Sequence, residues 1–143
     1  IILLGEWVLR NACLQNKIWQ NLGNKPIKLA VNVSGIQLMR ENFADFVRRA
    51  LEDSELAPEY MELELTESII MEDKPQNQRT LERLKEMGIY LTIDDFGTGY
   101  SSLNYLREFP VHKLKIDQSF IRNCFTNSND ASIITAIIAM GHN

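Results

Sequence analysis

Hydrophobic residues in the first part of the chain follow two periods, one typical of helices and one typical of strands. Over residues 7–19, apolar positions recur at steps of three and four, which predicts an amphipathic helix that ends near Gly23. Residues 28–34 instead alternate between apolar and polar side chains, as a half-buried strand does. A long helical pattern over residues 37–56 completes a first strand-then-helix unit.

The same succession returns along the rest of the chain. Residues 60–66 predict a strand, and residues 78–87 predict a helix that Gly88 ends. The remaining segments predict a strand, a short helix, a strand and a helix at residues 89–94, 101–108, 111–116 and 130–140. Repeated strand–helix units predict parallel strands with right-handed crossovers, arranged either as an open doubly wound sheet or as a barrel.

Each predicted strand carries polar side chains on one face. Because strand side chains alternate, the leucines of residues 61–66 share one face while Glu62 and Glu64 share the other. A parallel sheet covered on both faces would be apolar nearly throughout, so this pattern indicates a polar interior. In a barrel, polar residues near the carboxyl ends of strands form the active site. The polar faces gather Asn32, Glu62, Glu64, Asp94, Lys113, Lys115 and Asp117.

An antiparallel sheet with one solvated face is an alternative explanation of this alternation. Such a sheet would need no functional site, because its polar face would simply meet water. The helical segments between the predicted strands argue against it, since they are the crossovers of parallel units.

The polar residues at the strand ends predict a divalent-metal site. Asn32, Glu64 and Asp94 each fall near the end of a different predicted strand, and each offers a hard oxygen ligand that suits Mg²⁺ or Mn²⁺. Asp95 follows at once, so two adjacent carboxylates are placed to bind a metal pair bridged by Asp94. Crowded carboxylates repel and raise one another's pKa unless a cation lies between them.

Three further residues near this cluster have open alternatives. Lys115 is placed to pair with a carboxylate or to hold a water or phosphate oxygen, although a lysine inside a barrel can be purely structural. Glu67 lies just past a strand, where it either hydrogen-bonds loop backbone or is an exposed loop carboxylate. Gly97 permits a sharp turn or close backbone approach after the strand.

Composition and charge narrow the class of protein. With 143 residues and 45% apolar content, the chain is expected to form one domain or part of one. A net charge of −4 gives no general attraction to DNA, so an anionic ligand needs a local cation. The two cysteines predict no disulfide framework, and we expect reduced thiols and a cytoplasmic location. No uncharged stretch approaches the roughly 20 residues that span a bilayer, so we expect no membrane contact by this segment.

Four motifs follow one another in a specific order. They are Asn32-Val33-Ser34, Glu64-Leu65-Thr66-Glu67-Ser68, the run Asp-Asp-Phe-Gly-Thr-Gly-Tyr-Ser-Ser-Leu at residues 94–103, and Lys115-Ile116-Asp117. Over essentially the whole chain this combination resembles the EAL-domain cyclic-di-GMP phosphodiesterases. The resemblance implies a TIM-like barrel that hydrolyses cyclic-di-GMP to linear pGpG with Mg²⁺ or Mn²⁺.

The resemblance also implies roles for individual residues. Asn32, Glu64 and Asp94 correspond to metal ligands, and Asp95 to a ligand of the second metal. Lys115 corresponds to a lysine near the metal-bound nucleophilic water. No residue is assigned to substrate binding.

The resemblance also implies a role for one loop and for partners of the domain. Glu67 corresponds to the residue that fastens the loop from Asp95 to Ser101, which in the family links the site to homodimerisation. Fusion to sensory or GGDEF-type domains in the parent protein is a further expectation.

Two parts of the family pattern are expected outside the chain. The glutamate that names the family, a metal ligand, should precede residue 1, and the general-base glutamate should follow residue 143 with the later strands. We therefore expect residues 1–143 to be an EAL domain truncated at both ends. The expected fold is a partial TIM-like (β/α) barrel of about four parallel strands, without the first and last strands of the full barrel. This fragment alone is predicted to be inactive.

Two other functions remain as alternatives. One is a non-catalytic cyclic-di-GMP receptor or scaffold. The set of metal ligands argues against it, because a protein that only binds the nucleotide does not need them. The other is a metal-dependent barrel lyase that uses Lys115 as its base. The Asp-Asp-Phe-Gly-Thr-Gly loop argues against the lyase and favours the phosphodiesterase.

Overall fold

The computed structural model describes residues 2–72, 74–98 and 109–141. Its four strands form one parallel sheet in the order β1-β2-β3-β4, so the antiparallel alternative is wrong. Parallel strands in this order, with helices between β1 and β2 and between β2 and β3, confirm the predicted α/β fold. The strands are β1 (Leu29–Asn32), β2 (Met61–Thr66), β3 (Tyr90–Phe96) and β4 (Lys113–Ile116).

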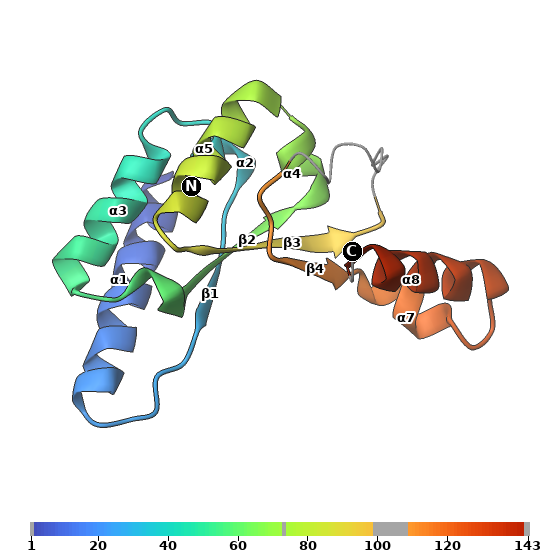
Figure 1. The fold of residues 1–143 in the computed structure, drawn as a ribbon, viewed down its shortest axis with the longest axis horizontal. Helices are drawn as coiled ribbons and strands as arrows, with labels where there is room; N and C mark the ends of the chain where they lie inside the picture. Colours follow the sequence, from blue (N-terminus) through green and yellow to red (C-terminus); the bar gives the residue numbers. More distant parts are fainter. Residues whose placement is uncertain (1, 73, 99–108, 142–143) are drawn as a thin grey trace.

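The helices fall into two groups around this sheet. Figure 1 shows α1, α3 and α5 gathered at one end of the molecule, whereas α7 and α8 form a pair beyond the point where β3 and β4 end. Among the described residues, no helix is long and apolar enough to cross a membrane. The helical segments are α1 (Ile2–Asn21), α2 (Gly35–Leu38), α3 (Phe43–Ser54), the 3-10 turn η1 (Pro58–Tyr60), α4 (Glu67–Met71), α5 (Lys74–Glu86), α7 (Gln118–Asn123) and α8 (Ser128–Gly141).

The aliphatic faces of the central strands form the core. Leu63 of β2 and Leu91 of β3 are fully buried and are partners in the strand register. They belong to one cluster with Leu81 and Leu84, which α5 contributes from its inner face. The predicted aliphatic faces of β2 and β3 therefore pack on the helices, which leaves their other face for the polar residues.

The helix predicted over residues 37–56 is two helices, α2 and α3. Ser34 and Gln37 form a capping arrangement that begins α2, with the Ser34 backbone N–H donating to Gln37 Oε1 at 3.2 Å. The chain then turns, and Asn42, a residue type favoured at helix starts, precedes α3. The buried residues Leu38 and Phe43 are five positions apart, a step that departs from the helical period and marks the break.

Two short helices directly follow strands and were not predicted. α4 begins after β2 and α7 after β4, and each is too short to show a helical period. Asp117 caps α7 by accepting the Ser119 N–H at 2.8 Å. The helix predicted over residues 101–108 lies outside the described residues.

A polar cluster covers the amino-terminal end of β3 and β4. The Tyr90 and His112 rings stack with centroids 4.5 Å apart, and His112 Nδ1 accepts the Leu91 N–H at 3.1 Å. Lys28 Nζ lies 3.0 Å from the centre of the Tyr90 ring. Partial burial lowers the pKa of His112, and the positive charges of Lys85 and Lys28 lower it further. The cluster therefore favours the neutral imidazole, whose Nδ1 is free to accept.

The His112 contact predicts a pH-dependent stability. Because folding lowers the pKa of His112, the unfolded chain binds the proton more readily, and stability should fall as pH drops below the ordinary histidine value of 6.5. The His112→Asn variant offers an acceptor that does not titrate, so it should lose part of this dependence. Urea unfolding of both proteins between about pH 8 and pH 5 measures how their free energies of unfolding depend on pH. Identical pH dependence in the two would show that His112 makes no such contribution.

Candidate metal and catalytic site

Strand register brings the predicted ligands to one edge of the sheet. Asn32 at the end of β1 lies opposite Glu64 of β2. Thr66, at the end of β2, lies opposite Asp94 of β3. Because all the strands are parallel, these carboxyl ends meet at the same edge, as the sequence predicted.

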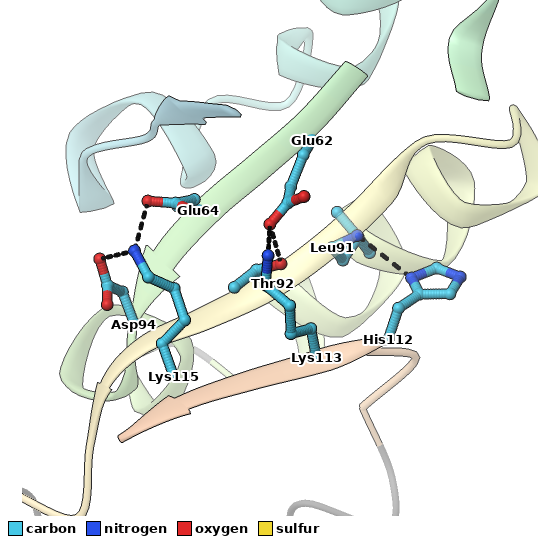
Figure 2. A network of polar contacts seen from close by, with 8 residues as sticks. All are labelled: Glu62, Glu64, Leu91, Thr92, Asp94, His112, Lys113 and Lys115. Atoms are coloured by element: carbon cyan, nitrogen blue, oxygen red, sulfur yellow. Dashed lines mark hydrogen bonds and ion pairs between the residues drawn. The ribbon is translucent and has the colours of Figure 1, made fainter. Parts of the chain in front are cut away.

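Lys115 joins the two carboxylates across the sheet. Its Nζ donates to Glu64 Oε2 at 3.0 Å and to Asp94 Oδ2 at 2.9 Å (Figure 2). Hydrogen bonds to Asp94 and Glu64 raise the pKa of Lys115, so the ammonium stays charged at neutral pH. Glu64 is buried, and the lysine supplies the cation that lets two carboxylates share this edge.

Asp95 lies at an irregularity in the sheet. The pairing of β3 with β4 shifts between Ile93 and Phe96, and Asp95 adopts a left-handed backbone with φ of 53°. Its N–H donates to Asp94 Oδ1 at 3.0 Å. Partial removal from water raises the pKa of Asp95, and the negative charges of Asp94 and Asp117 add to this. The positive charge of Lys115 opposes this effect only in part, so Asp95 stands in a predominantly negative environment.

Glu67 ties the segment after β3 to the start of α4. The Glu67 carboxylate is buried, and its Oε2 accepts the Gly97 N–H at 2.9 Å. The alternative of an exposed loop carboxylate is therefore wrong for Glu67. Of the loop from Asp95 to Ser101, the structure describes residues 95–98.

Gly97 combines an unusual backbone with close packing. Its φ is 100°, and a Cβ built on it would lie 3.0 Å from Phe120 Cε2 and 3.2 Å from Ile137 Cδ1. Glycine is thus required both by the left-handed backbone and by the contact with α7 and α8.

Alanine substitutions can separate these two requirements. Gly97→Ala is expected to lower the free energy of unfolding by about 1–3 kcal/mol more than Gly23→Ala does, because it adds overpacking to backbone strain. Gly23 is the matched control, since its φ is 82° and a Cβ there would meet nothing within 4 Å. Urea unfolding of both variants gives the comparison. Equal losses of unfolding free energy in the two variants would show that Phe120 and Ile137 move aside at little energetic cost.

A second group of polar side chains lies two residues before the strand-end group along each strand. Thr92 Oγ1 donates to Glu62 Oε1 at 2.7 Å, and Lys113 Nζ forms an ion pair with the same oxygen. Burial alone would raise the pKa of Glu62, but the hydrogen bonds from Lys113 and Thr92 lower it below its ordinary value. The sequence placed Glu62 and Lys113 on the polar face but did not predict this pairing, which depends on the register.

The donors at the strand ends are hard oxygens, which suit a divalent cation. Within the part of the chain that the structure describes, no group of three or more His, Cys, Asp or Glu side chains is arranged to hold a metal ion. Glu64 and Asp94 each place one carboxylate oxygen on the same Lys115 ammonium, and the exposed Asn32 lies opposite Glu64 in the register. Two carboxylates and an amide are a donor set that Mg²⁺ or Mn²⁺ accepts.

A model of the EAL domain matches residues 1–143. The chain belongs to the EAL domain family. It is 45% identical over 141 residues to the bifunctional diguanylate cyclase/cyclic di-GMP phosphodiesterase MucR of Pseudomonas aeruginosa, covering 99% of this chain and 21% of that protein. To the cyclic di-GMP phosphodiesterase NbdA of the same organism it is 46% identical over 137 residues, covering 96% of this chain and 18% of that protein. The chain thus spans about a fifth of the length of these relatives.

A solved EAL structure has the same arrangement of elements. The PaMucR phosphodiesterase in complex with cyclic-di-GMP superposes with a TM-score of 0.92 at 44% sequence identity. The match covers 99% of this EAL chain and 57% of the PaMucR chain. EAL domains are TIM-barrel-like, and the four-stranded sheet corresponds to part of such a barrel.

Proposed function

We propose that the full-length protein containing this EAL chain hydrolyses cyclic-di-GMP to linear pGpG with Mg²⁺ or Mn²⁺. The observation that carries the proposal is the meeting of Glu64, Asp94 and Lys115 at the carboxyl edge of the sheet. Relatives with 45% and 46% identity that are named as cyclic-di-GMP phosphodiesterases support the substrate.

In this proposal the strand-end oxygens hold the metal. Asn32, Glu64 and Asp94 would hold one ion, and Asp95 would hold a second. When bound, the ions lower the pKa of a water and neutralise charge that develops on the phosphorus. The hard-oxygen donors at one edge support this assignment, and so does the general metal dependence of EAL domains.

The protein's own residues orient the reaction. The Lys115 ammonium, already held by Glu64 and Asp94, is placed to bind a water or a phosphate oxygen. Glu67 holds the Gly97 backbone and thereby fixes the segment that carries Asp95. This contact supports the role of Glu67 as the anchor of the loop from Asp95 to Ser101.

The proposal extends to the assembly of the protein. A homodimer would form through the same loop, and the contact of Gly97 with α7 and α8 supports a link between the loop and those helices. Fusion to sensory or GGDEF-type domains is supported by the greater length of the relatives. A reducing, cytoplasmic setting is supported by Cys13 and Cys124, which are both free.

We further propose that residues 1–143 form an EAL domain truncated at both ends and inactive alone. The test compares this chain with the full-length protein, each incubated with cyclic-di-GMP and Mn²⁺, with the products separated by chromatography. The full-length protein is expected to release pGpG and the chain alone none. If the full-length protein binds the nucleotide and leaves it cyclic, it is a receptor instead. If the chain alone cleaves at the full-length rate, the expected truncation is wrong.

A further inference from the structure

The polar face of the sheet is built in two layers that follow one another along the strands, and Figure 2 draws them side by side with the strand-end layer on the left. The upper layer is the set at the strand ends, in which Lys115 reaches from β4 across β3 to Glu64 on β2. In the lower layer Lys113 makes the same crossing to Glu62, which also accepts the Thr92 hydroxyl. Each lower-layer residue precedes its upper-layer counterpart by two positions in the same strand, so the layers are Glu62, Thr92 and Lys113 below and Glu64, Asp94 and Lys115 above.

Backbone pairing does not hold Lys115 firmly in register. The β3–β4 ladder is regular where Thr92 faces Lys113 and where Ile93 faces Leu114. It then shifts, and resumes only where Phe96 faces Ile116. Two residues of β3, Asp94 and Asp95, therefore lie opposite a single residue of β4, Lys115, which is the pattern of a β-bulge. A slip of one residue in the four-residue strand β4 would turn Lys115 to the other face of the sheet.

The lower layer lies in the regular part of the ladder, one pair before the last regular pair, Ile93 and Leu114. Its bridge joins β2 to β4 over β3, because Glu62 lies on β2, Thr92 on β3 and Lys113 on β4. Glu62 is 6% exposed, so its carboxylate needs a cation at this depth. The bridge therefore adds a side-chain link between β2 and β4 just before the stretch in which the β3–β4 ladder is irregular.

With both layers present, each lysine has its own glutamate, Lys113 with Glu62 and Lys115 with Glu64. Residues two apart in a strand are about 7 Å apart, a separation that the long side chain of a lysine can cover. Without Lys113, the buried Glu62 would compete with Glu64 for Lys115. With Lys113 paired to Glu62, Lys115 is left to lie between Glu64 and Asp94.

We propose that Glu62, Thr92 and Lys113 are positioning residues that keep Lys115 between Glu64 and Asp94. They touch none of the proposed reacting groups and act through Lys115. This inference rests on the proposed function, because it gives Lys115 a part in the hydrolysis.

The test uses the full-length protein and three variants of the lower layer. Lys113→Met keeps the aliphatic stem and removes the cation, whereas Lys113→Arg keeps a cation of similar reach. We expect Lys113→Met to lower kcat by about 10- to 100-fold with KM little changed, and Lys113→Arg to restore most of it. The double variant Glu62→Gln/Lys113→Met leaves no buried unpaired charge and should fold where the single variant does not. It removes the competition for Lys115 but also lacks the bridge between β2 and β4, so the loss of kcat should remain because β4 is no longer tied in position.

A matched control and a structural readout complete the experiment. Lys25→Met, at an exposed lysine, should leave kcat unchanged. A crystal structure of Lys113→Met, or of the double variant if the single one does not fold, should show Lys115 moved from Glu64 or Asp94. If Lys115 keeps both contacts there, or if kcat stays at the wild-type value, the positioning role is overturned. If the wild-type protein does not hydrolyse cyclic-di-GMP, the proposed function fails, and the position of Lys115 in the variant still decides the positioning role.

Discussion

Replacing Asp94 by asparagine is expected to lower the rate of cyclic-di-GMP hydrolysis by the full-length protein by about 100- to 1,000-fold. Asp94 accepts from two donors, Lys115 Nζ at 2.9 Å and the Asp95 N–H at 3.0 Å, one on each carboxylate oxygen. Asparagine has a single acceptor oxygen, so its NH₂ group would face one of these donors. It also removes the negative charge that balances Lys115 and that a divalent ion requires.

A matched control separates this effect from a general loss of charge. Asp53 lies exposed on α3, away from the strand ends, so Asp53→Asn should keep the wild-type rate. Initial rates of product formation at saturating Mn²⁺, with circular dichroism to establish folding, compare the two variants. An Asp94→Asn protein that folds and keeps most of the wild-type rate would exclude Asp94 from the catalytic site.

The Leu63→Ala variant is expected to lose about 2–5 kcal/mol of unfolding free energy. Leu63 is fully buried in β2 and faces Val31 on one neighbouring strand and Leu91 on the other. Truncation would leave a cavity at the centre of the sheet, where strands on both sides restrict collapse. Urea unfolding of the domain gives the loss directly.

Leu22→Ala is the control for this substitution. Leu22 is 74% exposed, so removing the same atoms there should change stability by no more than about 0.5 kcal/mol. A loss at Leu63 no larger than the loss at Leu22 would mean that the core does not depend on the middle of β2.

The layout of the site followed from two simple features of the sequence. The period-two alternation put Glu64 and Lys115 on the polar faces of their strands, and the helices between strands indicated parallel pairing. Parallel strands end at one edge, so Asn32 and Asp94 were expected near Glu64 before any register was known. The metal site was predicted from the hard oxygens at the strand ends and the substrate from the family resemblance, and both remain proposals.

Other features depended on information that periodicity does not hold. The break between α2 and α3 shows only as one step of five residues between Leu38 and Phe43, and α4 and α7 are too short to have a period. The left-handed backbone of Asp95 and the pairing of Lys113 with Glu62 both arise from the local register of β3 and β4. Register is set by the whole sheet, so a strand pattern alone could not predict these contacts.

The most direct test of the proposed metal-dependent hydrolysis is a single-turnover assay triggered by metal. The full-length protein is first loaded with labelled cyclic-di-GMP in the presence of a chelator, and Mn²⁺ is then added in excess. The proposed function predicts that the bound nucleotide stays cyclic until Mn²⁺ is added and is then converted to linear pGpG. A nucleotide that remains bound and cyclic after the addition of Mn²⁺ would contradict it.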